Sequence, residues 1–431
     1  DRKGCLTWTG HLPFPEIYCC ISLLFRLVRA RRFLVKYCII IPDGMADYPV
    51  DKLSGRTPVE TARTPNLDFI AQNGLLGTVR TIPSGFPAGS DVANLTLLGY
   101  DPKKYYTGRA PLEAVSMGVK LNITDWAFRC NFITANEDIL EDFCAGHIKT
   151  DEADVLIKLL NQEFGSETIH FYTGKSYRHL MVYTGKQKMN AKCFPPHDIM
   201  GESIRKHLPK GNGGEILKDI MARSRAILAD HDINKVRIDL QENPANMIWL
   251  WGQGNRPDMP TFEERFQLTG AAITAVDLIR GIAVCIGWDV IDVPGATGYL
   301  DTNYANKGLY AIEALEDHDV VVVHIEATDE AGHEGNVHEK VLAIEQIDNK
   351  IIGPILNAKD RFRHLRILVL PDHYTPIVKR THTPEAVPFA VYGSGIVKGA
   401  GLAYSEANAN ASGLHIKEGH RLIEHLISGS F

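Results

Sequence analysis

The chain has 431 residues, of which 45% are hydrophobic and 23% are charged, and its formal net charge at pH 7 is -6. This length and composition suit a globular protein with two hydrophobic cores, and the negative charge excludes a broad basic surface, so we expect no nucleic-acid partner. The eight cysteines form no CxxC pair, which is typical of a cytoplasmic protein without disulfides.

Residues 1–35 are left unassigned as an N-terminal extension. Their apolar stretch is interrupted by Arg26 and followed by the letters RARR, without a small-residue cleavage site. The stretch is too short and too charged to cross a bilayer, so we expect no stable membrane insertion. A weak anchor at the membrane surface is the alternative, because the flank is rich in arginine.

A strand, a loop and a helix follow from Lys36 onward. The run YCIII at 37–41 predicts a buried strand, and the pattern at 64–73 predicts a helix that Gly74 ends. A loop rich in glycine and proline then leads to Ser90 and a second helix-compatible run. Strand, loop and helix in this order are the signature of an α/β protein.

The character of the sequence changes between 114 and 266. Short alternating runs at 127–135, 170–185 and 245–253 predict antiparallel strands, with helices at 152–164 and 215–232. Helices and buried strands alternate again from 267 to 431. We therefore predict one α/β core domain made of 36–113 and 267–431, with a central, mostly parallel sheet flanked by helices, and interrupted by an inserted α+β cap domain at 114–266.

Four clusters of carboxylates and imidazoles follow the apolar, β-branched runs. Strand ends are where such sites form in α/β sheets, and this ligand type suits Mn²⁺, Zn²⁺ or Mg²⁺. No cysteine takes part, which argues against a structural zinc and favours two catalytic divalent metals. The alternative is that each residue merely caps an element or lies on the surface. The proposed ligands are Asp43, Asp329, His333, Asp372, His373 and His382.

Spacing adds detail to two of these clusters. Asp329 and His333 are four residues apart, so one helical turn would point both in the same direction. Asp372 and His373 are adjacent, and they could reach different metals if the backbone turned between them.

Ser90 is the candidate nucleophile. It precedes a helix-compatible run, where the positive end of the helix would favour a phosphoryl group, and a divalent metal at its Oγ would stabilise the alkoxide. The alternative is that Ser90 only caps the helix, and spacing alone does not separate the two.

The segments PDGMAD, AGSDVANLTLLGYDP, YTGRAPLEA, ATDEAGHEG, PDHYTP and THTPEAVPF together resemble the archaeal-type cofactor-independent phosphoglycerate mutases of the alkaline phosphatase superfamily. The resemblance runs from about Lys36 to the end and includes the insertion. It implies an alkaline-phosphatase-like core, a phosphorylated Ser90, and two divalent metals, with Mn²⁺ as first choice and Mg²⁺, Zn²⁺ or Co²⁺ as alternatives. Asp43, Ser90, Asp372 and His373 would bind one metal, and Asp329, His333 and His382 the other.

The reaction implied is the interconversion of 2- and 3-phosphoglycerate through phosphoserine, without free bisphosphoglycerate. Cations would neutralise the phosphoryl and carboxylate oxygens. Our candidates for contacts with the substrate are Arg109, Arg129, Arg178, His179, Arg280 and Lys307. Proton transfer is assigned to His179, His197 or Asp125.

One block departs from the family pattern. Where many relatives have arginines, this chain reads EDFCAGHI, with Cys144 and His147 in their place. The substrate is therefore left open, and a phosphatase or another phosphotransferase, such as a proposed homoserine kinase, is the alternative. A protein that only senses a phosphorylated metabolite is a third hypothesis. The sequence indicates no oligomeric state.

Overall fold

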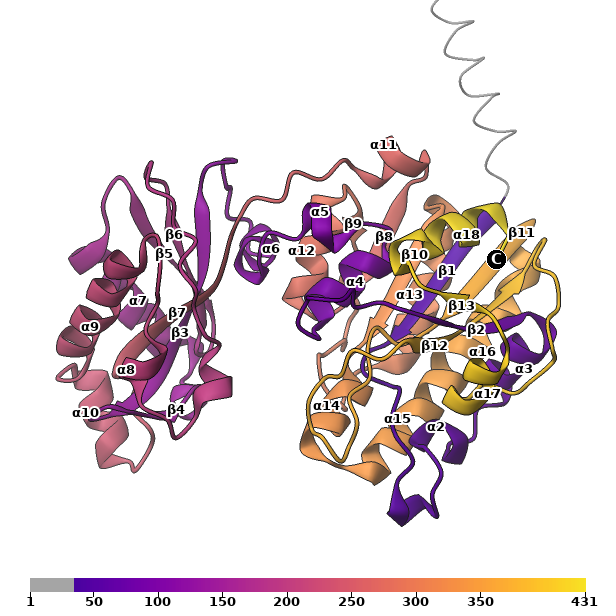
Figure 1. Ribbon diagram of the computed structural model, residues 1–431, viewed down its shortest axis with the longest axis horizontal. Coiled ribbons are helices and arrows are strands. Elements are labelled where there is room, and N and C mark those ends of the chain that lie inside the picture. Colours follow the sequence, from indigo (N-terminus) through magenta and orange to yellow (C-terminus); the bar gives the residue numbers. More distant parts are fainter. Residues whose placement is uncertain (1–34) are drawn as a thin grey trace, which may run out of the picture.

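The structure is a computed structural model, which describes residues 35–431. The extension proposed for residues 1–35 therefore lies outside the described residues, apart from Val35. Two units lie side by side, and the larger one contains both the beginning and the end of the described chain (Figure 1).

The larger unit is built on an eight-stranded sheet. Five of its neighbouring strand pairs are parallel, and the pairs β11·β12 and β12·β2 are antiparallel. The strands in spatial order are β13 (His415–Ile416), β2 (Leu75–Val79), β12 (Val387–Gly393), β11 (His364–Val369), β1 (Val35–Pro42), β10 (Val320–Ile325), β8 (Gly270–Ile273) and β9 (Asp289–Val290).

The central strands are apolar on both faces because helices cover both sides of the sheet. Ile40 of β1 packs into one hydrophobic cluster, and its neighbours Ile39 and Ile41 pack into the cluster on the opposite face. The predicted α/β fold with a mostly parallel, helix-flanked sheet is therefore confirmed. The helices of this unit are α2 (Pro58–Thr61), α3 (Pro65–Asn73), α4 (Ser90–Leu97), α5 (Pro102–Tyr105), α6 (Arg109–Ser116), α11 (Phe262–Phe266), α12 (Asp277–Cys285), α13 (Tyr304–Asp317), α14 (Ala327–Glu334), α15 (Val337–Ile347), α16 (Gly353–Asn357), α17 (Glu406–Ala411) and α18 (Leu422–Ser428).

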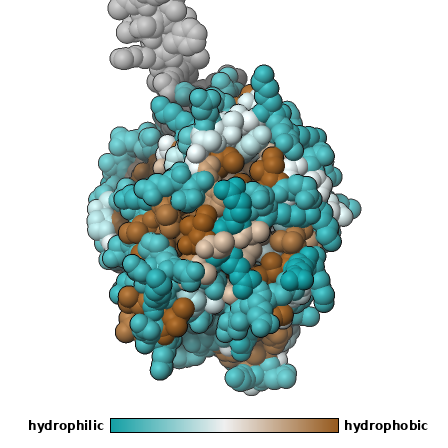
Figure 2. All heavy atoms as spheres, turned by 90° about the vertical axis from the view of Figure 1, so that its left-hand side faces the viewer, coloured by the Kyte–Doolittle hydropathy of each residue, from teal (hydrophilic) through white to brown (hydrophobic). Residues whose placement is uncertain are grey.

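The smaller unit is an antiparallel sheet with helices on one side. Its strands in spatial order are β4 (Ile139–Asp142), β3 (Trp126–Asn136), β6 (Arg178–Tyr183) and β5 (Ile169–Lys175). A fifth strand, β7 (Met247–Asn255), pairs with β3 along the edge opposite to β6. Its helices are α7 (Thr150–Phe164), α8 (Ile204–His207), α9 (Gly214–Leu228) and α10 (Asp232–Asp239). Figure 2 shows the end of the molecule formed by this unit, where hydrophilic side chains dominate and hydrophobic patches lie between them.

The chain crosses between the units at 117–125 and 256–261. Phe262 of α11 packs on Trp288, so α11 lies with the larger unit, whereas α6 contributes Leu112 to the larger unit and Ala110 and Ala114 to a cluster with the smaller sheet. The strands of the smaller sheet all fall inside the predicted insertion. The assignment of residues 114–266 as a separate cap domain stays a prediction. Among residues 35–431, no helix combines the length and apolar character needed to cross a membrane.

Candidate metal centre and active site

Three parallel strands bring the predicted clusters together. β1, β10 and β11 lie next to one another, with Ile41 opposite His324 and Ile40 opposite Val369. Since parallel strands end at the same edge of a sheet, the residues that follow them meet there. The backbone N–H of Asp43 donates to the Ile325 carbonyl at 2.9 Å, which extends the β1·β10 ladder up to the first carboxylate.

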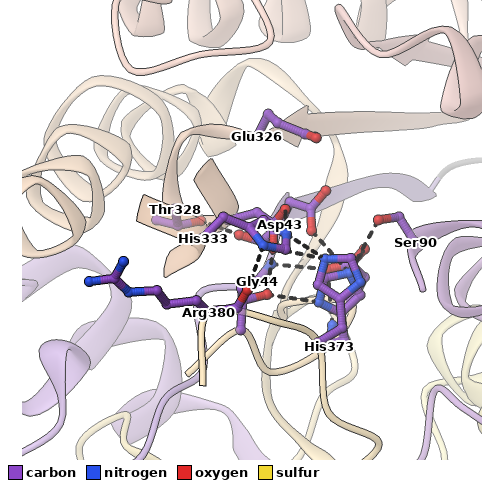
Figure 3. Close-up of polar contacts among 12 residues, drawn as sticks. Asp43, Gly44, Ser90, Glu326, Thr328, His333, His373 and Arg380 are labelled. Atoms are coloured by element: carbon purple, nitrogen blue, oxygen red, sulfur yellow. Dashed lines mark hydrogen bonds and ion pairs between the residues drawn. The ribbon is translucent and has the colours of Figure 1, made fainter. Parts of the chain in front are cut away.

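The first group consists of Asp43, Ser90, Asp372 and His373. His373 Nε2 lies 3.2 Å from Ser90 Oγ and 3.4 Å from both Asp43 Oδ1 and Asp372 Oδ2. Figure 3 shows Ser90 reaching His373 from the opposite side to Asp43. Ligand atoms of Asp372 group with those of Asp43 and His324, whereas those of His373 group with Asp329 and His382, so the division of this adjacent pair between the metals stays a prediction.

The second group consists of Asp329, His333 and His382. Asp329 Oδ2 is 3.2 Å from His333 Nε2, and Asp329 Oδ1 is 3.4 Å from His382 Nε2. The two histidine Nε2 atoms are 2.9 Å apart. Asp329 and His333 lie on α14, so the four-residue spacing does place both on one side of a helical turn.

Hydrogen bonds fix the tautomers of two of these histidines. His333 Nδ1 is 3.0 Å from the Arg380 carbonyl, which can only accept, so Nδ1 carries a proton and Nε2 is the nitrogen left to bind a metal. His373 Nδ1 is 3.2 Å from Thr375 Oγ1, whose own proton is donated to Asp329 Oδ1. His373 must therefore donate to Thr375 and also present the Nε2 lone pair, as metal-binding histidines do.

A backbone N–H and a side-chain amide set the position of Asp372. Its Oδ1 accepts from the Gly44 N–H at 3.1 Å, and its Oδ2 accepts from Asn94 Nδ2 at 2.8 Å. Gly44 has a φ of +60°, and a Cβ at this position would overlap the carboxylate of Asp329 and Thr375. The glycine that follows Asp43 is thus required by both its backbone conformation and this close approach.

Unpaired buried atoms indicate that the residues fit divalent cations. Asp43 is fully buried, yet neither of its carboxylate oxygens has a hydrogen-bond partner among the described residues. Burial and then the charges of Asp372, Glu326 and Asp329 raise the pKa of Asp43 well above its ordinary value. Burial alone would also raise the pKa of Asp329, but contacts with His333 and His382 hold it well below its usual range. A cation between the carboxylates would remove this repulsion.

His324 is a member of the cluster that the sequence did not predict. Its Nε2 lies 3.1 Å from Asp43 Oδ2, its side chain is 1% exposed, and burial lowers its pKa to about 4. Ligand atoms of Asp43, His324 and Asp372 lie within 4.8 Å of one another, as do those of Asp43, Glu326 and Asp329. The signal was a single imidazole inside the otherwise apolar strand VVVVHI.

The capping alternative for Ser90 is not what the structure shows. Ser90 is the first residue of α4, the N-cap is Gly89, and no side chain caps this helix. The half-buried Ser90 Oγ instead contacts His373 Nε2.

A cavity of about 810 Å³ lies between the two units, and its lining includes Glu326, whose carboxylate groups with those of Asp43 and Asp329. Neither Ser90 nor the other proposed metal ligands line it. Arg109, Arg178 and His179 line its other side. Arg129 lies next to this wall, because its Nε is 2.9 Å from Glu113, which lines the cavity. Four of the six proposed substrate contacts therefore gather at one place. His179 is neutral there, because burial lowers its pKa to about 3.

The other proposed contacts lie elsewhere. Arg280 pairs with the exposed Asp292 at 2.7 Å, and Lys307 is buried with its Nζ 2.9 Å from the His324 carbonyl. Asp125 accepts from the backbone and side chain of Asn122, which makes it a turn residue. None of these, nor His197, lines the cavity.

The divergent block EDFCAGHI forms a local turn around Asp142. The Cys144 thiol and the Gly146 N–H point to the Asp142 carboxylate at 2.9 and 2.6 Å. His147 is exposed, and its ring meets the edge of Tyr177. Neither Cys144 nor His147 lines the cavity, so the altered block leaves the arginines of the cavity in place.

The fold and this cluster define an α/β protein with a candidate metal centre beside a serine and, between its two units, a cavity bordered by arginines. A family model described as 2,3-bisphosphoglycerate-independent phosphoglycerate mutase matches residues 71–234. A mutase of that name from Methanothrix thermoacetophila is 49% identical over 92% of this chain and 100% of its own. A probable mutase from Geobacter sulfurreducens is 48% identical over 91% and 100%. The chain belongs to the family of 2,3-bisphosphoglycerate-independent phosphoglycerate mutases, which confirms the predicted resemblance and enzyme class.

Solved structures agree with this assignment. A Pyrococcus horikoshii protein is 31% identical, with a TM-score of 0.77 and coverage of 92% of this chain and 97% of that one. A cofactor-independent phosphoglycerate mutase from Thermoplasma acidophilum is 27% identical, with a TM-score of 0.61 and coverage of 92% and 100%.

Proposed function

We propose that this protein interconverts 2-phosphoglycerate and 3-phosphoglycerate without free bisphosphoglycerate, through a phosphoryl group carried on Ser90. The observation that carries the proposal is the position of Ser90 Oγ, 3.2 Å from His373 Nε2 within a cluster of buried carboxylates. The names of relatives that are 48 to 52% identical support the substrate class.

Two sets of residues would hold divalent cations in this reaction. Asp43, Ser90, Asp372 and His373 form one set, and Asp329, His333 and His382 form the other. Bound there, two cations would polarise the phosphoryl oxygens and favour ionisation of the Ser90 hydroxyl. Mn²⁺ is our first choice, and Mg²⁺, Zn²⁺ and Co²⁺ suit the same oxygen and nitrogen ligands.

Each half of the reaction moves one phosphoryl group and one proton. Ser90 Oγ attacks phosphorus and loses its proton, the bond from phosphorus to the substrate oxygen breaks, and that oxygen gains a proton. The bound glycerate then turns so that its other hydroxyl attacks the phosphoserine, which restores Ser90. Arg109, Arg129 and Arg178 would hold the carboxylate and phosphoryl oxygens, because guanidinium groups pair with such oxyanions through two parallel bonds.

Retention of glycerate distinguishes a mutase from a phosphatase on the same centre. A phosphatase gives the group on Ser90 to water, whereas a mutase must keep the glycerate in place and keep water out until the group returns. The position of the cavity between the two units, which could hold the glycerate from both sides, supports the mutase. No relative or contact favours a homoserine kinase.

The test is a reaction of purified protein with 3-phosphoglycerate and Mn²⁺ in the absence of bisphosphoglycerate, followed by phosphorus NMR. We expect the signal of 2-phosphoglycerate to grow until equilibrium, without inorganic phosphate. Accumulation of inorganic phosphate alone would identify a phosphatase. No change of 3-phosphoglycerate would refute both.

A further inference from the structure

Glu113 lies inside the group of arginines that borders the cavity, and neither the metal centre nor the proposed chemistry gives it a part. It is on α6, the helix that packs against both units, and it lines the cavity with Arg109 and Arg178. Each of its carboxylate oxygens contacts a different arginine. Oε1 is 3.1 Å from Arg109 Nε, and Oε2 is 2.9 Å from Arg129 Nε.

Both arginines contact Glu113 through Nε, on the side of the guanidinium, and not through the two Nη groups at its end. Within the described part of the chain, the Nη groups of Arg109 and Arg129 donate no hydrogen bond. An arginine held only at Nε keeps its two Nη groups available for an oxyanion. A carboxylate that formed the usual bidentate pair would instead occupy one Nη group.

Arg129 has a second contact beside Glu113. Its guanidinium carbon lies 4.2 Å from the centre of the Trp251 ring, and its Nε forms an ion pair with Glu113 that lacks the geometry of a hydrogen bond. The side chain of Arg129 is only 7% exposed. Burial lowers the pKa of Arg129 to about 10, and the Glu113 charge opposes that shift. The group is therefore ordered and charged before any ligand arrives.

We propose that Glu113 is a positioning residue that turns Arg109 and Arg129 so that their Nη groups face an oxyanion of the substrate. The inference rests on the proposed function, and the ligand class is a small hydroxy acid with a phosphoryl and a carboxylate group. Because Arg129 belongs to β3 and Arg109 to α6, Glu113 joins the two segments into one receptor.

A purely electrostatic role makes the opposite prediction. Glu113 places a negative charge among cations, so its neutralisation would strengthen anion binding if charge alone mattered. In Glu113→Gln the amide oxygen can still accept from the Arg109 Nε–H, but the neutral amide no longer pairs with the charge of Arg129, and its nitrogen offers that guanidinium only a second donor. One arginine would turn away from its present orientation, and anion binding would weaken.

The experiment measures KM and kcat for 3-phosphoglycerate in Glu113→Gln and Glu113→Asp, and binding of inorganic phosphate and of Mn²⁺ by calorimetry. Loss of orientation at one arginine predicts a KM about 10-fold or more above wild type, with a smaller change in kcat. Binding of inorganic phosphate weakens as well, whereas the affinity for Mn²⁺ does not change, and Glu113→Asp recovers part of the loss. Asp219→Asn is the matched control, because Asp219 pairs with Arg223 at the same i,i+4 spacing on the exposed face of α9.

Coupling distinguishes positioning from general damage. Arg109→Lys keeps the charge but lacks the fork, so its effect on KM and that of Glu113→Gln should not add in the double variant. If Glu113→Gln does not fold, the same double-mutant cycle can be measured with Glu113→Asp and Arg109→Lys. An unchanged KM, tighter phosphate binding or full additivity overturns the role of Glu113. Wild-type protein that is inactive on 3-phosphoglycerate refutes the proposed function, while phosphate binding still decides the role of Glu113.

Discussion

Ser90 Oγ and His373 Nε2 lie 3.2 Å apart although 283 positions separate them in the sequence. Since the Nδ1 proton of His373 is used by Thr375, its Nε2 lone pair faces the serine. Ser90→Ala removes the oxygen that would carry phosphorus and leaves the surrounding contacts of the cluster intact. We expect turnover of 3-phosphoglycerate to fall by at least about 1,000-fold, equivalent to roughly 4 kcal/mol of activation free energy. Ser84→Ala, in the exposed part of the same loop, is the control and should keep full activity.

Asp43 contributes two buried oxygens that accept no hydrogen bond from any residue between 35 and 431, so its removal should act on metal binding. Asp43→Asn loses the charge that a divalent cation requires, and we expect Mn²⁺ affinity to fall by more than about 100-fold, since even outer partners of metal ligands contribute 10- to 100-fold. Chelation should inactivate the wild-type protein reversibly, with Mn²⁺ restoring activity. Calorimetry measures the affinity, and Asp239→Asn in the exposed part of α10 is the control. Equal affinities for Mn²⁺ would remove Asp43 from the ligands.

His324 approaches the other oxygen of Asp43 and is buried in β10. A neutral ring at this distance either shares a cation with Asp43 or holds the carboxylate in place, and both roles serve the metal. His324→Gln should therefore reduce Mn²⁺ affinity by about 10- to 100-fold while KM for 3-phosphoglycerate at saturating Mn²⁺ changes little. A variant with normal metal affinity and altered stability alone would make His324 a residue of the hydrophobic core.

Lys340 and Asp47 form an ion pair in which neither side chain is exposed. Lys340 Nζ donates to Asp47 Oδ2 at 2.8 Å and to the Thr375 carbonyl at 2.9 Å, which connects α15 with two segments that carry ligands. Lys340→Met leaves Asp47 buried without a counter-charge and should cost about 3–5 kcal/mol of unfolding free energy. Denaturation in the presence of chelator separates this loss from metal binding. The double variant with Asp47→Asn should regain part of it, and an additive double variant would contradict the pairing.

Glu406 gives stability a dependence on pH. Burial raises its pKa to about 7, from an ordinary value of 4.5, and its oxygens accept from the Asp47 N–H and the Thr57 hydroxyl. The folded state therefore binds more protons than the unfolded state between these two values, so unfolding free energy should fall as pH rises through this window. The contribution of this one group is about 3 kcal/mol. Glu406→Gln should remove this slope, which urea denaturation between pH 5 and 8 measures; an unchanged slope would assign it to other groups.

Short apolar runs were sufficient to predict the core and the meeting point of the ligands. The runs before Asp43, Thr328 and Asp372 predicted strands with candidate ligands at their ends. The structure places these strands next to one another, so the proposed ligands lie at one edge of the sheet. The spacing of Asp329 and His333 predicted that both lie on one side of a helix, because residues four apart in a helix are about one turn apart.

Contacts that depend on side-chain direction could not be predicted in this way. Arg129 and Arg280 were both candidates for contact with the substrate, but Arg129 lies against Glu113 at the cavity whereas Arg280 pairs with Asp292. His324 was hidden because a buried strand residue is expected to pack and not to bind. Lys340 and Asp47 form an ion pair through tertiary packing although they lie 293 residues apart, and no local pattern predicts such a pair.

The most direct test of the account is to trap the phosphoryl group on the protein. Wild-type protein with Mn²⁺ and 3-phosphoglycerate is stopped with acid during turnover, digested and analysed by mass spectrometry. The account predicts phosphate on the peptide that contains Ser90, at that serine, and no phosphate there without substrate or in Ser90→Ala. Turnover with an unmodified Ser90, or with phosphate on another residue, would contradict it.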